Sequence, residues 1–522
     1  MAGHPPSSSL QPSPRRSDLS RQSAAAAEAK AGRRILVRGV NWLGDAVMTT
    51  PALLRLREKF PAAHITLLGP EKLADLWKNH PAVDETLSFA AGESVFAIAK
   101  KIRQHRFSLS PAGSGDPGEI SSNDSHIEPK HPLIHPADTL SPTGGEGRGE
   151  GVRCSSHHLE PHGEISPNDS HLEPPNPLVA GPCQDAGNVS PSPRLTGAEG
   201  SNGERAGVRC SSHHLEPHGE GAASADKFDL ALVLPNSPRS ALEVFLAGIP
   251  QRLGYARPWR NFFLTQAVPS RAEAVKMHKR SAPEIQRLVT GANPQIGNQK
   301  SEIGNPLAHH IHEYLHLVAA LGASPEPLAP QLAVTPEELA AAKRKFGLEN
   351  ILQPVFGLNP GAEYGPAKRW PAEKFIAAAR EIQQQTNCVW LIFGGKSDQE
   401  LAGRIAAGIH PPSSILHPQN LAGKTSLREL MALLKLCRVL LTNDTGPMHV
   451  AAALGTPVVV PLGSTSPELT GPGLPGDPRH RLLKSDAPCA PCFLRECPID
   501  FRCLTGITVE RVVGAVLSAQ GR

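Results

Sequence analysis

The sequence predicts an α/β protein of two domains, the first of which is interrupted by a long insertion. Short apolar runs of strand length alternate with helical patterns, which is typical of parallel sheets covered by helices. A long tract without periodic apolar residues separates two parts of the first pattern. Once that tract is set aside, the remaining sequence suits two α/β domains of ordinary size.

Composition supports this division and excludes several function classes. Hydrophobic content of 39% and aromatic content of 4%, with 52 prolines and 47 glycines, indicate globular sequence diluted by something else. The net charge of +4 is small for 522 residues and gives no nucleic-acid footprint. We expect no membrane span, no secretory signal, and therefore reduced cysteines in the cytoplasm.

The domain boundaries follow from shifts in composition. Residues 1–32 are expected to form a disordered tail. The N-terminal domain spans 33–330 and contains the insertion (108–225) and a second weak tract (291–306). The C-terminal domain spans 331–522 and has a cysteine-rich end.

The insertion repeats itself, since GVRCSSHHLEPHGE occurs at 151–164 and again at 207–220. Its Pro, Gly, Ser, His and Glu residues cannot bury enough apolar surface to offset the entropy of ordering. It also lacks the apolar face of a solenoid repeat. Its Cys and His residues could bind a metal, but the composition favours a solvated low-complexity segment.

Alternating patterns define the elements of both domains. In the first domain we expect strands over 35–40, 64–69, 228–234 and 252–255, and helices over 46–60 (interrupted by Pro51), 73–80, 95–105, 241–247, 276–289 and 309–321. In the second we expect strands over 355–359, 389–395, 439–441 and 458–463, and helices over 337–346, 372–384, 427–436 and 447–455, from 398 and from 509.

Ligands bind α/β proteins in loops at the carboxyl ends of parallel strands. In the first such loop, Asp45 follows a glycine at a helix start, where a carboxylate can act as a general base or merely cap the helix. A second loop contains Asn236, Ser237 and Arg239.

Two loops of the second domain are suited to anions. Lys368 and Arg369 are adjacent cations that suit phosphate oxygens, although a solvated basic pair is the plainer alternative. The stretch 440–457 runs from a strand into a helix start, which can bind an anion or be an ordinary corner. Thr445 and His449 lie one turn apart there. Without a P-loop or G-x-G-x-x-G, the pattern suggests a cleft enzyme that holds a nucleotide diphosphate in one half and an acceptor in the other.

Four motifs carry a family resemblance. NWLGD at 41–45 resembles the first motif of bacterial ADP-heptose:lipopolysaccharide heptosyltransferases, glycosyltransferase family 9. LPNS at 234–237, with RSAL and AGIP after it, is similar to the second motif, and TNDTGPMHVAAAL at 442–454 to the last. NPGAEYGPAKRWP at 359–371 resembles the heptosyltransferase II branch in particular.

The resemblance implies a GT-B fold, in which two Rossmann-like domains enclose a cleft. It implies inverting transfer of L-glycero-D-manno-heptose from ADP-heptose to the first heptose of the inner core, without a cofactor or required metal. Asp45 is then the base and Lys368 stabilises the departing diphosphate. Expected donor contacts are Gly361, Glu363, Arg369, Asp444, Thr445, Gly446 and His449. Expected acceptor contacts are Asn41, Asn236, Ser237 and Arg239. An acidic residue expected near the ribose falls on Asp398, with Lys396 beside it.

The implied acceptor, heptosyl-Kdo-lipid A, places the enzyme in the cytoplasm, peripherally on the inner face of the inner membrane. WRNFF at 259–263 is a candidate membrane contact, or else a core turn. Two alternatives remain: a GT-B transferase with another nucleotide sugar or acceptor, and a non-catalytic binding protein. Neither predicts an interaction with nucleic acid.

The C-terminal end carries four cysteines, Cys489, Cys492, Cys497 and Cys503. Four thiols within fifteen residues could form a structural zinc site. Because the spacing lacks two C-x-x-C pairs, reduced cysteines without a metal are the favoured interpretation.

Overall fold

The computed structural model describes residues 32–105, 227–291, 305–409 and 417–520. These residues belong to one compact unit of the chain. The predicted tail, the insertion with its repeats and most of the second weak tract lie outside the described residues.

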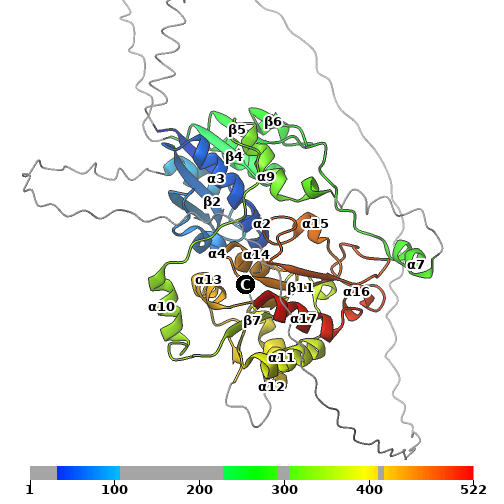
Figure 1. Cartoon of the computed structure of the whole chain (residues 1–522). Coiled ribbons are helices and arrows are strands. Elements are labelled where there is room, and N and C mark those ends of the chain that lie inside the picture. Colours follow the sequence, from blue (N-terminus) through cyan, green and yellow to red (C-terminus); the bar gives the residue numbers. More distant parts are fainter. Residues whose placement is uncertain (1–31, 106–226, 292–304, 410–416, 521–522) are drawn as a thin grey trace, which may run out of the picture. The chain divides into compact units, whose positions relative to one another are not determined.

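The first sheet is parallel and has six strands in the order β3-β2-β1-β4-β5-β6 (Figure 1). Their bounds are β1 Arg34–Arg38, β2 His64–Pro70, β3 Glu85–Phe89, β4 Leu230–Val233, β5 Gln251–Tyr255 and β6 Gln266–Val268. Helices α3 (Thr50–Lys59) and α9 (Ile311–Ala319) pack together and share a core with Ile35 and Val37 of β1. Leu36 points to the opposite face, toward α5 (Val95–Gln104) and α6 (Pro238–Leu246). The inner strands β1, β2 and β4 are largely apolar because both of their faces are covered.

The second sheet repeats this topology in the order β12-β11-β10-β7-β8-β9. Its strands are β7 Val355–Asn359, β8 Val389–Ile392, β9 Gln419–Asn420, β10 Leu440–Thr442, β11 Val458–Leu462 and β12 Arg481–Lys484. One core contains residues of α13 (Leu427–Leu436) and α14 (Gly446–Ala453), with α10 (Pro336–Lys345) packed on α13. The other contains residues of α11 (Ala372–Thr386), α12 (Gln399–Ile409) and α17 (Val509–Gln520). Counted from the first strand of each half, both sheets have the strand order 3-2-1-4-5-6 of dinucleotide-binding folds.

Contacts tie the two halves together. One hydrophobic core cluster contains residues of both sheets. Arg428 of α13 forms an ion pair with Glu338 of α10 and also donates hydrogen bonds to the carbonyls of Ala333, Asp75 and Lys78. A single guanidinium therefore joins the second half, the connecting segment and the first half. Within the described residues, no helix is long and apolar enough to cross a membrane.

Three predicted helices differ from the structure. The helix expected over 46–60 is two helices, α2 (Leu43–Met48) and α3, because Pro51 lies at the second position of α3 and cannot continue α2. The helix expected over 276–289 was wrong in its first half. Ser281 and Glu284 form a capping box there, so α7 begins at Ala282 and ends at Thr290.

The helix expected over 73–80 is the short α4 (Glu71–Ala74) followed by a 3-10 helix, Asp75–Trp77. The sequence also gave no sign of several short elements: β3, β6, β9, β12, α15 (Pro467–Thr470) and α16 (Arg502–Thr505). Among the strands, β6 and β9 have three and two residues. Runs that short carry no readable periodicity.

Candidate active site

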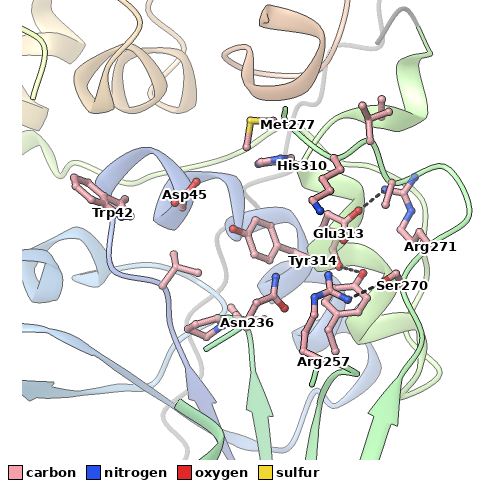
Figure 2. Close-up of a pocket in the computed structure, with 18 of the residues that line it drawn as sticks. Trp42, Asp45, Asn236, Arg257, Ser270, Arg271, Met277, His310, Glu313 and Tyr314 are labelled. Carbon is pink, nitrogen blue, oxygen red and sulfur yellow. Dashed lines mark hydrogen bonds and ion pairs between the residues drawn. The ribbon is translucent and has the colours of Figure 1, made fainter. Parts of the chain in front are cut away.

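The two sheets place loops from distant parts of the sequence at equivalent points. In each sheet the strand order reverses beside the first strand, between β1 and β4 and between β7 and β10. Ligands of open α/β sheets bind at such switch points. A cavity of about 760 Å³ lies beyond the first one (Figure 2). Its polar lining residues include Asn41, Asp45, Asn236, Tyr255, Arg257, Ser270, Arg271, Lys276, His310, Glu313 and Tyr314.

Asp45 lies in the first turn of α2 and lines this cavity. Burial raises the pKa of its carboxyl group, while the charges of His310 and Lys368 act in the opposite direction. Lys368 comes from the loop after β7, in the second sheet. The predicted base and the predicted leaving-group cation therefore interact electrostatically although 323 positions of sequence numbering, from 45 to 368, separate them.

His310 and Tyr314 line the cavity with Asp45 and were not predicted as site residues. In Figure 2 the Tyr314 ring extends from α9 toward Asp45, and His310 lies at the start of the same helix. The backbone N–H of His310 donates to the carbonyl of Leu469, 2.9 Å away in the second half. Burial lowers the pKa of His310, and the charges of Asp45 and Glu313 oppose this shift. The cluster of His309, His310 and His312 was a signal in the sequence that could have drawn attention to this segment.

The opposite rim of the cavity is cationic. Arg271 forms an ion pair with Glu313 at 3.4 Å, and Arg257 donates to the hydroxyl of Ser270 (Figure 2). Lys276 is exposed beside them. The cavity thus combines the partly buried carboxylate of Asp45 with a rim that suits an anionic ligand.

Lys368 is held in place by Asp444, whose Oδ2 lies 2.8 Å from Nζ. Thr465 donates a hydrogen bond to the same carboxylate oxygen, and the ring of Tyr364 lies 4.9 Å from the ammonium. Burial acts to raise the pKa of Asp444, but Lys368, Thr465 and His449 outweigh it and hold the pKa below its usual value. The carboxylate therefore stays ionised and anchors Lys368, which has further N–H donors for a ligand.

The loop that carries Lys368 is fixed from two sides. Asn443 accepts from the Trp370 N–H at 3.0 Å and donates to the Pro360 carbonyl at 2.7 Å. From the cysteine-rich end, the Arg495 carbonyl accepts from the Ala367 N–H at 3.0 Å. Gly365 has a φ of 148°, and a Cβ there would meet the Arg495 carbonyl oxygen at 2.4 Å. Only glycine allows this approach.

The start of α14 is packed against the first half. A Cβ on Gly446 would meet Leu43 at 2.9 Å, and a Cβ on Gly44 would meet the His449 ring at 2.7 Å. Pro447 has no N–H, and the Met448 N–H donates to the carbonyl of Thr445. This helix start therefore offers fewer donors to an anion than its sequence suggests. Burial lowers the pKa of His449 to about 4, despite the nearby charge of Asp444.

The other predicted donor residues have diverse surroundings. Glu363 is exposed. Arg369 donates to the Ala362 carbonyl and lies 3.9 Å from Asp398. The Asp398 carboxylate accepts from the Gly395 N–H and lies so close to Gly361 that a Cβ there would meet it at 2.4 Å. Asp398 therefore lies against Gly361, another of the predicted donor contacts, and its contact with the ribose stays a prediction.

The predicted acceptor residues divide into two pairs. Asn41 and Asn236 line the cavity. Ser237 instead caps α6 by accepting from the Ser240 N–H. Arg239 pairs with Glu243 at 3.2 Å and donates to the Glu93 carbonyl. Acceptor binding by Ser237 and Arg239 stays a prediction, since both side chains already have structural partners.

The cysteine-rich end packs against other parts of the protein. Cys489, Cys492, Cys497 and Cys503 are free thiols. Across the part of the chain that the structure describes, no group of three or more His, Cys, Asp or Glu residues is arranged to hold a metal. Cys489 and Cys492 pack with Ile285 of α7, and the Arg280 N–H donates to the Cys492 carbonyl.

Comparison with known proteins shows the family of this chain. The profile described as "Glycosyltransferase family 9 (heptosyltransferase)" matches residues 290–501. Lipopolysaccharide heptosyltransferase 2 of Escherichia coli K12 is 33% identical over 247 residues, 47% of this chain and 63% of that protein. Lipooligosaccharide heptosyltransferase 2 of Haemophilus ducreyi is 32% identical over 266 residues, 49% of this chain and 67% of that protein. The chain belongs to glycosyltransferase family 9.

Solved structures show the fold of family 9. The structure titled E. coli ADP-heptose lps heptosyltransferase II has a TM-score of 0.56 at 21% identity, covering 93% of this chain and 98% of that one. A family 9 glycosyl transferase from Veillonella parvula has a TM-score of 0.57 at 17% identity, covering 94% and 97%. The predicted GT-B fold is confirmed. The alignments with the E. coli and Haemophilus influenzae heptosyltransferase 2 sequences span 63% and 65% of those proteins.

Proposed function

We propose that this protein transfers L-glycero-D-manno-heptose from ADP-heptose to the first heptose of the lipopolysaccharide inner core. The electrostatic interaction between Asp45 and Lys368 carries the proposal, because it joins a partly buried carboxylate and a fixed cation from opposite sheets. Support for the sugar and acceptor comes from heptosyltransferase 2 relatives at 32% and 33% identity. The donor is supported by the structure of the E. coli ADP-heptose lps heptosyltransferase II, whose fold this chain shares.

The reaction follows from this arrangement. The Asp45 carboxylate accepts the proton of an acceptor hydroxyl, whose oxygen forms a bond to the anomeric carbon of the heptose. The bond from that carbon to the diphosphate oxygen breaks on the opposite side, so the configuration inverts. ADP leaves with the electron pair, and the ammonium of Lys368 stabilises its charge. The raised pKa of Asp45 makes it a better base than an exposed aspartate.

Two further assignments belong to the proposal. The cavity beside Asp45 holds the acceptor, whose anionic groups suit the rim of Arg257, Arg271 and Lys276. ADP lies beyond β7 and β10, with Asp444 orienting Lys368 rather than touching phosphate, since its carboxylate already binds the ammonium. The enzyme works in the cytoplasm, peripherally on the inner face of the inner membrane, where this acceptor is made.

The test is a coupled assay with ADP-heptose and defined lipid A acceptors bearing Kdo alone or Kdo and one heptose. We expect heptose transfer only to the heptose-bearing acceptor. Asp45→Asn should abolish turnover and leave ADP affinity within about twofold, because the side chain contacts the acceptor hydroxyl and not the nucleotide. Release of ADP without transfer to any heptose-bearing acceptor would contradict the specific activity. Loss of ADP binding in Asp45→Asn would make the residue structural.

A further inference from the structure

The loop after β5 exposes two large aromatic rings, Trp259 and Phe262. Their side chains are 90% and 80% exposed, within four residues of each other. We call residues 257–263 the aromatic tip. A single exposed apolar side chain needs no explanation, but two rings on one short loop form a patch.

Hydrogen bonds within the aromatic tip and to the Pro235 carbonyl hold it in this conformation. Arg260 is fully buried, and its Nη1 donates to the Pro235 carbonyl at 2.7 Å. The Asn261 side chain accepts from the Arg257 N–H at 2.9 Å. Trp259 has a φ of 64°, a left-handed conformation that a bulky residue adopts only where its surroundings enforce it. The buried Arg260 and the unfavourable φ of Trp259 together keep the indole ring exposed to solvent.

The aromatic tip and the sequence after it, taken together, are strongly basic. Residues 257–280 contain six cations and one acidic residue: Arg257, Arg260, Arg271, Lys276, Lys279 and Arg280 against Glu273. Arg260 and Arg280 are buried, whereas Lys276 and Lys279 are exposed. Met277, 42% exposed, lies between these lysines. We call Lys276, Met277 and Lys279 the basic rim, because Lys276 and Met277 line the mouth of the cavity beside Asp45.

We infer that the aromatic tip and the basic rim form a docking surface for an anionic lipid bilayer. Trp and Phe rings bind at the membrane interface, and Lys side chains are drawn to anionic headgroups. The excess of positive charge and the projecting rings complement that surface better than they complement a protein groove. The inference rests on the proposed function, since it explains how a lipid-linked acceptor reaches the cavity: Arg257 belongs to both the tip and the cavity lining.

Flotation of the full chain with phosphatidylcholine vesicles, with and without 30% phosphatidylglycerol (about one lipid in three, chosen to mimic an anionic surface), tests this. We expect binding to the anionic vesicles and a loss of about tenfold or more in partitioning for Trp259→Ser/Phe262→Ser. Lys279→Gln should weaken binding to the anionic vesicles only. Leu352→Ser is the matched control, since Leu352 is 95% exposed but outside both surfaces, and should bind as the native chain does.

Activity on a water-soluble acceptor without acyl chains separates the two proposals. The Trp259→Ser/Phe262→Ser chain should keep native turnover there, which also shows that it folds. A chain that binds vesicles but transfers no heptose contradicts the proposed function alone. Two results overturn the docking surface. One is equal vesicle binding by the native and double-variant chains. The other is a fluorescence difference between the native and Trp259→Ser chains that is typical of a buried indole before vesicles are added; the difference is needed because the chain has five tryptophans.

Discussion

Asp45 and Lys368 show how strongly single residues of the proposed site depend on their charged neighbours. Burial makes the Asp45 carboxyl a stronger base, and the opposing charge of Lys368 limits that shift. Lys368 is itself fixed by Asp444, and Asp444 by Thr465. Asp45, Lys368, Asp444 and Thr465 form a series in which each group interacts with the next. Removing one of them therefore changes the electrostatic surroundings of the others.

The pH dependence of turnover should report this coupling. Asp45 acts as a base only when ionised, so kcat/KM should fall as the pH falls through its raised pKa, which lies above 3.8. Lys368→Gln should lower kcat by about 10²–10³-fold, as loss of a transition-state donor does. It should also move the acidic limb to higher pH, because the ammonium lowers the pKa of Asp45. Lys345→Gln, which breaks a surface pair with Glu429, should leave both unchanged. An acidic limb that stays in place in Lys368→Gln would contradict the coupling.

Helices α2 and α14 form the element-scale feature on which the site depends. They approach closely because Gly44 faces the His449 ring and Gly446 faces Leu43. α2 carries Asp45, and α14 follows the loop that carries Asp444. Glycine at these two positions therefore sets the distance between the Asp45 carboxylate, the proposed base, and the loop that carries Asp444.

Gly44→Ala tests this packing. The new Cβ would lie 2.7 Å from a carbon of the buried His449 ring, so α2 must move away from α14. A displacement near 1 Å at a catalytic group costs roughly tenfold to hundredfold in rate. We expect kcat/KM to fall by that factor and the melting temperature to drop. Gly514→Ala is the control, because a Cβ there meets nothing within 4 Å and alanine favours the helix. Native kinetics in Gly44→Ala would show that the contact does not position Asp45.

At the scale of the whole molecule, buried neutral histidines couple stability to pH. Burial lowers the pKa of His80, His449 and His480 to about 4 and that of His309 to about 3. Two of them, His309 and His449, lie where the halves meet. Acid should therefore loosen the contact between the two sheets as well as each core.

The sign of the effect follows from proton linkage. Below pH 6.5 these histidines bind protons in the unfolded chain but stay neutral in the folded one. The free energy of unfolding is therefore highest above pH 6.5 and decreases as the pH falls toward 4. Each histidine contributes up to about 1.4 kcal/mol per pH unit in that window. Urea unfolding at pH 7, 6, 5 and 4 measures how steeply the free energy of unfolding changes with pH. His480→Gln should reduce this slope by the contribution of one histidine. Equal slopes for the native and His480→Gln chains would contradict this account.

The sequence predicted most of what local chemistry controls. The helix expected over 427–436 is α13, and the βαβ order and two-domain α/β class follow from alternating apolar patterns. Errors arose where a local signal overrode the pattern, as with the capping box of Ser281 and Glu284. Asp45 and Lys368 could be proposed because their motifs resemble those of a family, although no spacing rule connects them.

What the sequence determined by itself is the class of fold, the covered parallel strands and the residue types in each loop, because periodicity and turn chemistry act over a few residues. Only the tertiary structure placed Lys368 where its charge acts on Asp45, and brought His310 and Tyr314 into the cavity. It also gave Ser237 and Arg239 structural partners. These outcomes depend on contacts between segments that are distant in the chain. Such contacts arise from the packing of two sheets and leave no periodic trace in the sequence.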